Sequence, residues 1–219
     1  MGQIDERGNG SRREARRQDR RDAILAVAAQ SFLTNGYAGT TMSAIAATLG
    51  GSKGTLWSYF PCKEALFAAF LERATAAYRG RLSEIFDPCG DLRATLTRFC
   101  ASLMERVMTP ETIALHRLVV AESGRFPEIG RIYYERGPRI TQTMLTGYLE
   151  GVMARGLVRR DDAGAAARAL IGLCMASYYQ QVLTGWVDAV PPEQIEREID
   201  RAVVLFLRAY ALDQGEDRR

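Results

Sequence analysis

The chain has 219 residues, of which 47% are hydrophobic and 25% are charged. This length accommodates one large domain or two small ones, and these proportions exclude a largely disordered or fibrous chain. The net charge is only +3, but seven basic and three acidic residues give residues 12–60 a charge of +4, whereas residues 61–219 sum to zero. We therefore expect a polyanion to meet only the N-terminal part, although a solvated basic tail on an unrelated domain would show the same balance.

The four cysteines form no CxxC pair, and the chain has a single histidine, His116. We expect no disulfide framework, no metal site and no cofactor. The N-terminus has no apolar segment typical of a signal peptide. The best candidate for a membrane span, the uncharged residues 169–187, contains two glutamines that a bilayer would penalise. The sequence therefore predicts a cytoplasmic protein that does not contact a membrane.

Apolar residues recur at helical spacing almost throughout, and no sustained alternation indicates strands. We predict an all-α fold of about nine helices, preceded by a flexible tail at residues 1–11. The first helix starts in the arginine run and ends near Asn35-Gly36, a helix-ending pair. Thr41 is a good N-cap for a short helix whose apolar residues end at Leu49.

Ser52 can cap a second short helix, residues 53–60, which Pro61 ends because its ring does not fit a helix interior. A long helix, residues 63–86, follows. Pro138 is expected to kink or split a later one. The remaining predicted helices span about residues 92–108, 111–124, 127–154, 162–185 and 192–213.

Two short helices joined by a glycine-containing turn, residues 41–60, are typical of a helix-turn-helix. Lys53 adds a cation at the positive end of a helix dipole, a cost that a neighbouring phosphate would offset. Gly54 would let that phosphate approach the backbone closely. A ligand-free helical hairpin has the same pattern, but the adjoining first helix carries Arg20 and Arg21 among further arginines, which favours nucleic acid.

The run TTMSAIAATLGGSKGTLWSYFPCKEALF, preceded by ILAVAAQSFLTNGYAGT, resembles the DNA-binding segment of the TetR/AcrR family of transcriptional repressors over about residues 21–67. LHRLVVAESGRFPEIGRIYYERGP is similar to C-terminal domains in part of that family. The resemblance implies a helix-turn-helix DNA-binding domain at residues 12–62 and a helical ligand-binding and dimerisation domain at residues 63–219. It also implies a homodimeric repressor, released from a palindromic operator by a small-molecule inducer.

By the same resemblance, the second short helix enters the major groove, and residues on the supporting helix and at the start of the fourth contact phosphates. Gly51 stands where a small apolar residue is common, and Trp57 replaces the usual tyrosine. Neither departure affects the expected fold, but both leave the base preference open. Together with the first-helix arginines, the predicted DNA-binding residues are Arg20, Arg21, Thr41, Ser43, Lys53, Gly54, Thr55, Trp57, Ser58, Tyr59 and Lys63.

Polar and aromatic residues in apolar surroundings suit a pocket for an organic inducer, although at helical spacing each is more often a core residue. The candidates are His116, Arg117, Tyr133, Tyr134 and Tyr178. The last helix contains AVVLFL, residues 202–207, which is apolar on every side and suggests a partner subunit or deep burial in one subunit. The predicted dimer residues are Leu173, Ser177, Val203, Val204, Phe206 and Leu207.

Two other function classes fit the helical pattern less well. An enzyme has little support, because the chain contains a single histidine, no HExxH and no true phosphate-binding loop. An adaptor protein would not explain a basic arm beside a capped helix-turn-helix. Cys62 could act as a redox switch, or it could be a tolerated substitution.

Overall fold

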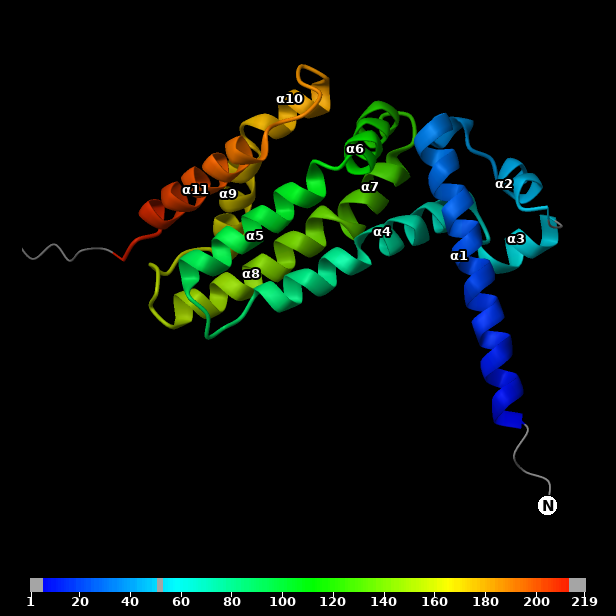
Figure 1. Cartoon of the computed structure of the whole chain (residues 1–219), viewed down its shortest axis with the longest axis horizontal. Helices are drawn as coiled ribbons and strands as arrows, with labels where there is room; N and C mark the ends of the chain where they lie inside the picture. The colour runs from blue at the N-terminus through cyan, green and yellow to red at the C-terminus, as the bar shows by residue number, and fades with distance from the viewer. Residues whose placement is uncertain (1–5, 51–52, 213–219) are drawn as a thin grey trace, which may run out of the picture. The chain divides into compact units, whose positions relative to one another are not determined.

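The computed structural model describes residues 6–50 and 53–212, and their side chains except those of residues 6–11 and Lys53. These residues form eleven helices and no strand, which confirms the all-α prediction (Figure 1). The chain divides into two compact units. The first unit contains the chain up to Ala74 together with Leu118–Tyr133, and the second contains Thr75–Arg117 and the chain from Tyr134 onward.

The first unit is built from α1 (Glu6–Gly39), α2 (Met42–Thr48), α3 (Lys53–Tyr59) and the start of α4 (Lys63–Ile85). Residues 6–11, predicted as part of a flexible tail, are helical. Helical geometry in α1 is interrupted at Gly36, whose φ of 73° is in the left-handed region. The unit is thus larger than the predicted domain of residues 12–62, because it includes the first half of α4 and a segment far along the chain.

Aromatic residues form the core of the first unit. The ring of Phe32, fully buried on α1, lies 5.1 Å from that of Phe67 and 6.0 Å from that of Phe70, both on α4. Tyr37 stacks on Phe32 at 5.9 Å. Burial of rings this large is strongly stabilising, and it holds α1 against α4.

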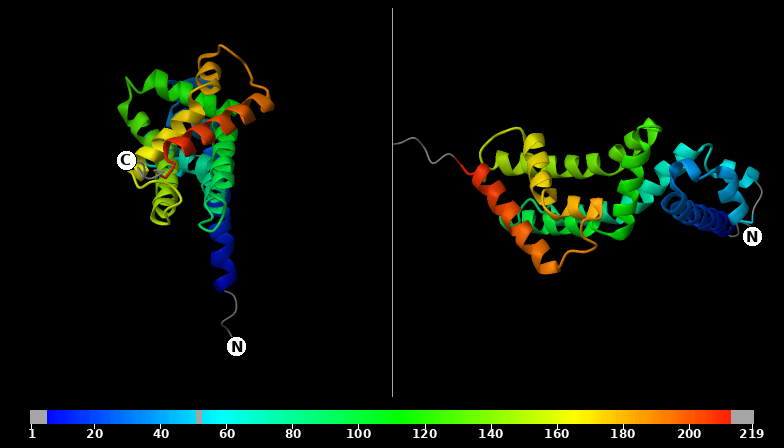
Figure 2. Two further views of the ribbon diagram at one scale, coloured as in Figure 1. Left: turned by 90° about the vertical axis from the view of Figure 1, so that its left-hand side faces the viewer. Right: turned by 90° about the horizontal axis from the view of Figure 1, so that it is seen from above.

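The second unit contains α5 (Leu92–Val107), α8 (Pro138–Ala154), α9 (Ala163–Met175), α10 (Tyr178–Thr184) and α11 (Pro192–Ala209). Helix α9 packs against α5, α8, α10 and α11 (Figure 2). Asp91 and Asp162 cap α5 and α9 through hydrogen bonds from the amides of Ala94 and Ala165. The second half of α4 contributes Tyr78, Leu82 and Ile85 to the core of this unit.

Two predicted helices are each divided in the structure, which explains the larger number. Residues 127–154 form α7 (Pro127–Arg136) and α8, separated at Gly137, because Pro138 can begin a helix but cannot continue one. Residues 162–185 form α9 and α10, separated at Ser177, whose φ and ψ of −98° and −93° are not helical. Helix α6 (Pro110–Glu122) contributes residues to both units.

None of the helices in the described ranges is long and apolar enough to cross a membrane. Within the same residues, no cluster of three or more histidine, cysteine or acidic side chains could hold a metal ion. All four cysteines are free thiols, exposed at Cys62 and Cys89 and buried at Cys100 and Cys174. A hydrogen bond with Cys174 and burial both raise the pKa of the Cys100 thiol, which keeps it protonated.

Candidate nucleic-acid interface

Helix α2 presents a polar face beside a buried apolar one. Thr41 is its N-cap, and the hydroxyl oxygen accepts a hydrogen bond from the amide of Ala44 at 3.1 Å, as predicted from its residue type. Ile45 and Ala46 are buried. Thr41 and Ser43, both predicted to contact phosphates, are exposed.

Helix α3 is divided in the same way. Leu56 and the following Phe60 are buried at 2% and 4% exposure, whereas Gly54, Trp57 and Ser58 are exposed. The Ser58 hydroxyl donates to the carbonyl oxygen of Thr55 at 2.7 Å. It therefore presents lone pairs outward, which suit the amino groups of bases better than phosphate oxygens. Thr55 and Tyr59 are half-buried.

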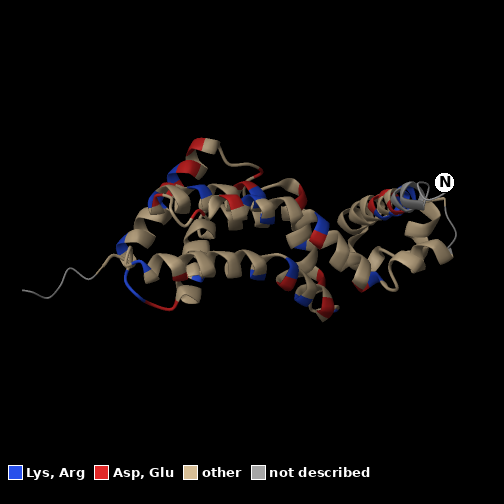
Figure 3. Cartoon of the chain, turned by 90° about the horizontal axis from the view of Figure 1, so that it is seen from below, with Lys and Arg blue, Asp and Glu red and all other residues tan. Residues whose placement is uncertain are grey.

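The basic part of the first unit lies along α1. Arg12, Arg13, Arg16 and Arg17 are exposed, and Figure 3 shows Lys and Arg on this helix beside acidic residues. Arg20 and Arg21 are half-buried. The guanidinium of Arg21 lies 5.1 Å from the centre of the Phe60 ring, so this side chain packs at the C-terminal end of α3. Three of the predictions fall outside what the structure describes. They concern the capping role of Ser52, the departure from the family pattern at Gly51, and the side chain of Lys53.

Lys63 makes contacts inside the first unit that the sequence analysis did not predict. The ammonium donates to the carbonyl oxygen of Tyr37 at 2.7 Å and lies 4.0 Å above the Tyr37 ring. It also lies 5.7 Å from the centre of the Phe126 ring. A contact between Lys63 and phosphate remains a prediction, and it would have to use the donors that Tyr37 leaves free.

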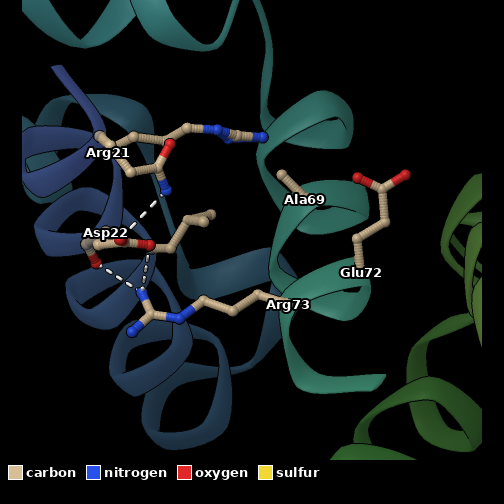
Figure 4. A pocket seen from close by; sticks show the side chains of 7 residues that line it. Arg21, Asp22, Ala69, Glu72 and Arg73 are labelled. Carbon is tan, nitrogen blue, oxygen red and sulfur yellow. Dashed lines mark hydrogen bonds and ion pairs between the residues drawn. The ribbon is translucent and has the colours of Figure 1, made fainter. Parts of the chain in front are cut away.

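A shallow hollow of about 240 Å³ lies between α1 and α4 within the first unit (Figure 4). Arg73 of α4 crosses it, donating to the carbonyl oxygen of Asp22 at 2.7 Å and pairing with the Asp22 carboxylate at 3.4 Å. Gln18 donates to the same carboxylate at 3.1 Å. No sequence motif predicted this hollow. The ion pair between Asp22 and Arg73 joins α1 to α4 across it.

Comparison with known proteins agrees with this geometry. A family model described as bacterial regulatory proteins, tetR family, matches residues 24–70, and one described as the AefR-like transcriptional repressor C-terminal domain matches residues 94–212, more than half of the chain. The chain belongs to the TetR family of transcriptional regulators. It is therefore a DNA-binding regulator rather than an enzyme, and α2 and α3 are the family's helix-turn-helix.

Individual relatives of this TetR-family regulator match it over very different lengths. An HTH-type transcriptional regulator of Bacillus subtilis, YhgD, is 22% identical over 174 residues, which is 80% of this chain and 87% of YhgD. The repressor NemR of Escherichia coli is 40% identical over 67 residues, or 31% of this chain and 34% of NemR. Among solved structures, the flavonoid-responsive regulator FrrA is 31% identical with a TM-score of 0.76, covering 90% of this chain and all of FrrA. A TetR-family protein of Mesorhizobium loti is 25% identical with a TM-score of 0.78, covering 89% and 98% of the two chains.

The residues predicted to bind an inducer differ in their surroundings. Burial lowers the pKa of His116, which hydrogen-bonds through Nδ1 to the hydroxyl of Tyr179 on α10. Arg117 also contacts α10, through two backbone carbonyls. Tyr178 is a half-buried residue of the same helix. Three of the five candidates thus lie on or beside α10 in this TetR-family protein.

The other two inducer candidates show no such grouping. Tyr134 is 51% exposed, and its hydroxyl donates to Gln142 at 3.5 Å. Tyr133 is half-buried and belongs to the first unit, whereas the other four candidates belong to the second.

The predicted dimer residues differ in their burial. Val203 and Phe206 are 0% exposed and belong to the core of the second unit. The apolar run is covered by its own subunit on one face, and Leu205, which was not predicted, is 44% exposed on the other. The remaining candidates, Leu173, Ser177, Val204 and Leu207, are half-buried.

Proposed function

We propose that this regulator is a homodimeric repressor that binds a palindromic operator and leaves it when a small organic inducer binds. The observation that carries the proposal is the division of α3, with Leu56 buried and Trp57 and Ser58 exposed. A recognition helix needs this arrangement, since one face must hold it to the supporting helix while the other meets base edges.

In the proposed complex, α3 lies in the major groove and α2 crosses the backbone. Thr55, Trp57, Ser58 and Tyr59 would face the bases, and the indole of Trp57 would offer an N–H donor or apolar contact. Phosphates would be met by Thr41, Ser43, Lys53, Lys63, the amide end of α3 near Gly54, and the α1 arginines including Arg20 and Arg21. Repression takes place at DNA, so we place the protein in the cytoplasm.

Exposed residues on α9 and α11 support the proposed dimer. Helix α9 exposes Ala169 and Gly172, and Ala176 is exposed just after it, so that these small side chains would let a partner helix approach closely. Helix α11 adds half-buried Val204 and exposed Leu205. Two copies related by a twofold axis would form a four-helix interface and present two recognition helices to successive major grooves, about 34 to 36 Å apart.

Unpartnered hydroxyls in the second unit support a small-molecule inducer. The side-chain oxygens of Ser102 and Tyr148 are buried without a hydrogen-bond partner in the described structure, an arrangement that costs free energy unless a partner binds. The Tyr148 ring stacks on Phe86 at 5.1 Å, and Phe86 stacks on Phe99 at 5.5 Å. Because FrrA is described as flavonoid-responsive, we propose a planar phenolic inducer.

Release would be a shift between two separations of the recognition helices. An inducer that binds the mismatched separation more tightly depletes the DNA-bound state by that difference in affinity and no more. Helix α4 runs from the helix-turn-helix into the second unit, so it is the natural lever.

Selection from a pool of random duplexes tests this proposal. We expect recovery of a palindrome whose half-sites are about one helical turn apart, bound by a dimer. Titration of the recovered duplex with a panel of flavonoids and simple phenols should then identify compounds that release it. Recovery of no duplex above background at low ionic strength would contradict operator binding, whereas recovery without release by any phenol would contradict only the inducer class.

A further inference from the structure

A carboxylate from the end of α6 binds the corner between α1 and α2. The two Glu122 oxygens accept hydrogen bonds from the amides of Tyr37 at 2.8 Å and Ala38 at 2.7 Å. Glu122 is the last residue of α6 and lies 85 positions after Tyr37, yet both belong to the first compact unit. Charge-assisted bonds of this length are about twice as strong as neutral ones.

Gly36 makes these two amides available. Its φ of 73° and ψ of 175° interrupt helical geometry, so the amides that follow begin a new turn and, like those at any helix start, need an external acceptor. A Cβ at Gly36 would lie 2.5 Å from a Glu122 oxygen. The glycine therefore permits both the backbone conformation and the close approach of the carboxylate.

Tyr37 is held from its other side by a positive charge. The Lys63 ammonium donates to the Tyr37 carbonyl oxygen, and the ring of Phe126 lies 5.4 Å from the Tyr37 ring in an edge-to-face arrangement. We call Glu122, Lys63 and Phe126 the Tyr37 clamp. The clamp holds Tyr37 at its amide, its carbonyl and its ring. Lys63 comes from the start of α4, whereas Glu122 and Phe126 come from a segment that is distant in sequence from both Tyr37 and Lys63.

The clamp lies immediately before the helix-turn-helix. Thr40 donates to the Gly36 carbonyl oxygen at 2.7 Å, and the next residue, Thr41, is the N-cap of α2. We propose that Glu122 is a positioning residue for DNA binding: it contacts no DNA, but fixes the corner from which α2 and α3 are directed. Loss of the Glu122 carboxylate would remove no recognition residue, but it would let α2 and α3 adopt more orientations. Binding to a defined site would therefore be weaker.

The test compares E122Q with E111Q, which removes the charge of an exposed glutamate at the start of the same helix. The probe is a duplex of about 30 base pairs selected with the wild-type protein, long enough for two half-sites. We expect E122Q to bind it about tenfold more weakly, because a neutral amide oxygen accepts less strongly than a carboxylate. Removing a negative charge would by itself strengthen binding to DNA, so the direction of the change separates positioning from charge.

Two further measurements keep the test specific. The slope of log K against log salt concentration should not change, because no phosphate contact is lost. Hydrogen exchange at the Tyr37 and Ala38 amides should be faster in E122Q and unchanged in E111Q, and this measurement needs no DNA. It therefore decides whether the clamp exists even if no duplex is selected.

E122D serves as the second variant if E122Q does not fold. It keeps the charge but is one methylene shorter, so we expect weaker binding in the same direction and faster exchange of at least one of the two amides. Equal or tighter DNA binding by these variants, or unchanged exchange at both amides, would overturn the proposal. So would an equal loss of affinity in E111Q.

Discussion

Arg117 and Val182 are joined by a hydrogen bond of 2.7 Å from the guanidinium Nη2 to the carbonyl oxygen. Nε of the same arginine donates to the next carbonyl, that of Leu183, at 2.8 Å. Both carbonyls lie in the last turn of α10, where helical amides are few, and the Val182 carbonyl also accepts the amide of Gly185 at 3.1 Å. A seven-residue helix has little stability of its own, so the cation at its negative end stabilises it.

Replacing Arg117 should therefore destabilise α10. We expect R117A to lower the free energy of unfolding by about 1 kcal/mol, the usual contribution of a partly exposed hydrogen-bonding group, and R117K to lose less. Urea unfolding measures the difference, and hydrogen exchange should show it concentrated in Tyr178–Thr184. R131A removes an exposed arginine from α7 and is the control. An equal loss in R131A would show that the contacts of Arg117 carry no special stability.

The contacts of Lys63 lead to a second prediction. K63M removes the hydrogen bond to Tyr37 and the cation above its ring, so the free energy of unfolding should fall by about 1 to 2 kcal/mol. K53A, by contrast, should not lower stability, because it removes a cation from the positive end of a helix dipole, and it should reduce the salt slope of DNA binding by about one. Thermal unfolding and a salt titration on one selected duplex make the comparison. Wild-type stability in K63M would mean that Lys63 is free to act as a phosphate contact alone.

Capping and helix-ending residues predicted the helix-turn-helix from the sequence. Contacts between residues far apart in the sequence could not be predicted in this way. Thr41 as an N-cap and Pro61 as a stop determined α2 and α3 because both act on adjacent backbone. The bond from Tyr37 to Glu122 joins residues 85 positions apart, and no periodicity or spacing indicates such a partner. The family resemblance predicted that Lys63 contacts phosphate, which stays a prediction; no signal indicated that its ammonium lies on Tyr37, a partner that is also distant in sequence.

In the last helix, α11, the sequence alone did not predict which face is buried. Six consecutive apolar residues, 202–207, do not reveal which face is inward, because every side of the helix is apolar there. The charged first half of α11 sets that orientation in the structure, with Asp200 and Arg201 exposed and Ile199 buried. Continuing the same pattern places Val203 and Phe206 inward and Leu205 outward.

This orientation defines the variant that tests the dimer. V204D/L205D places two charges on the outer face of α11, where desolvation against a partner would be costly, and should give monomers by light scattering. L157D, at a residue 49% exposed beyond α8, should remain dimeric. F206A should instead destabilise the subunit by about 3 to 5 kcal/mol, as for any buried phenylalanine. A persisting dimer in V204D/L205D would place the interface on another face.

The single histidine makes a pH prediction that can be assigned to one residue. Burial lowers the pKa of His116 below the value of about 6.5 expected in the unfolded chain. Between those two pKa values the unfolded chain binds a proton that the folded chain does not, so stability falls as the pH drops through about 6.5 toward the folded-state pKa. The hydrogen bond to Tyr179 does not reverse this sign, because desolvation determines the direction of the shift.

H116N tests the assignment, since its side-chain amide can occupy the position of Nδ1 but does not titrate. Urea unfolding at about pH 7 and about pH 5 should show a smaller loss of stability in H116N than in the wild type. Carboxylates also titrate near the lower pH, but they are common to both proteins and cancel in the difference. If the two proteins lost the same stability, protonation of His116 would not be coupled to unfolding, and its bond to Tyr179 would have to persist in the charged form.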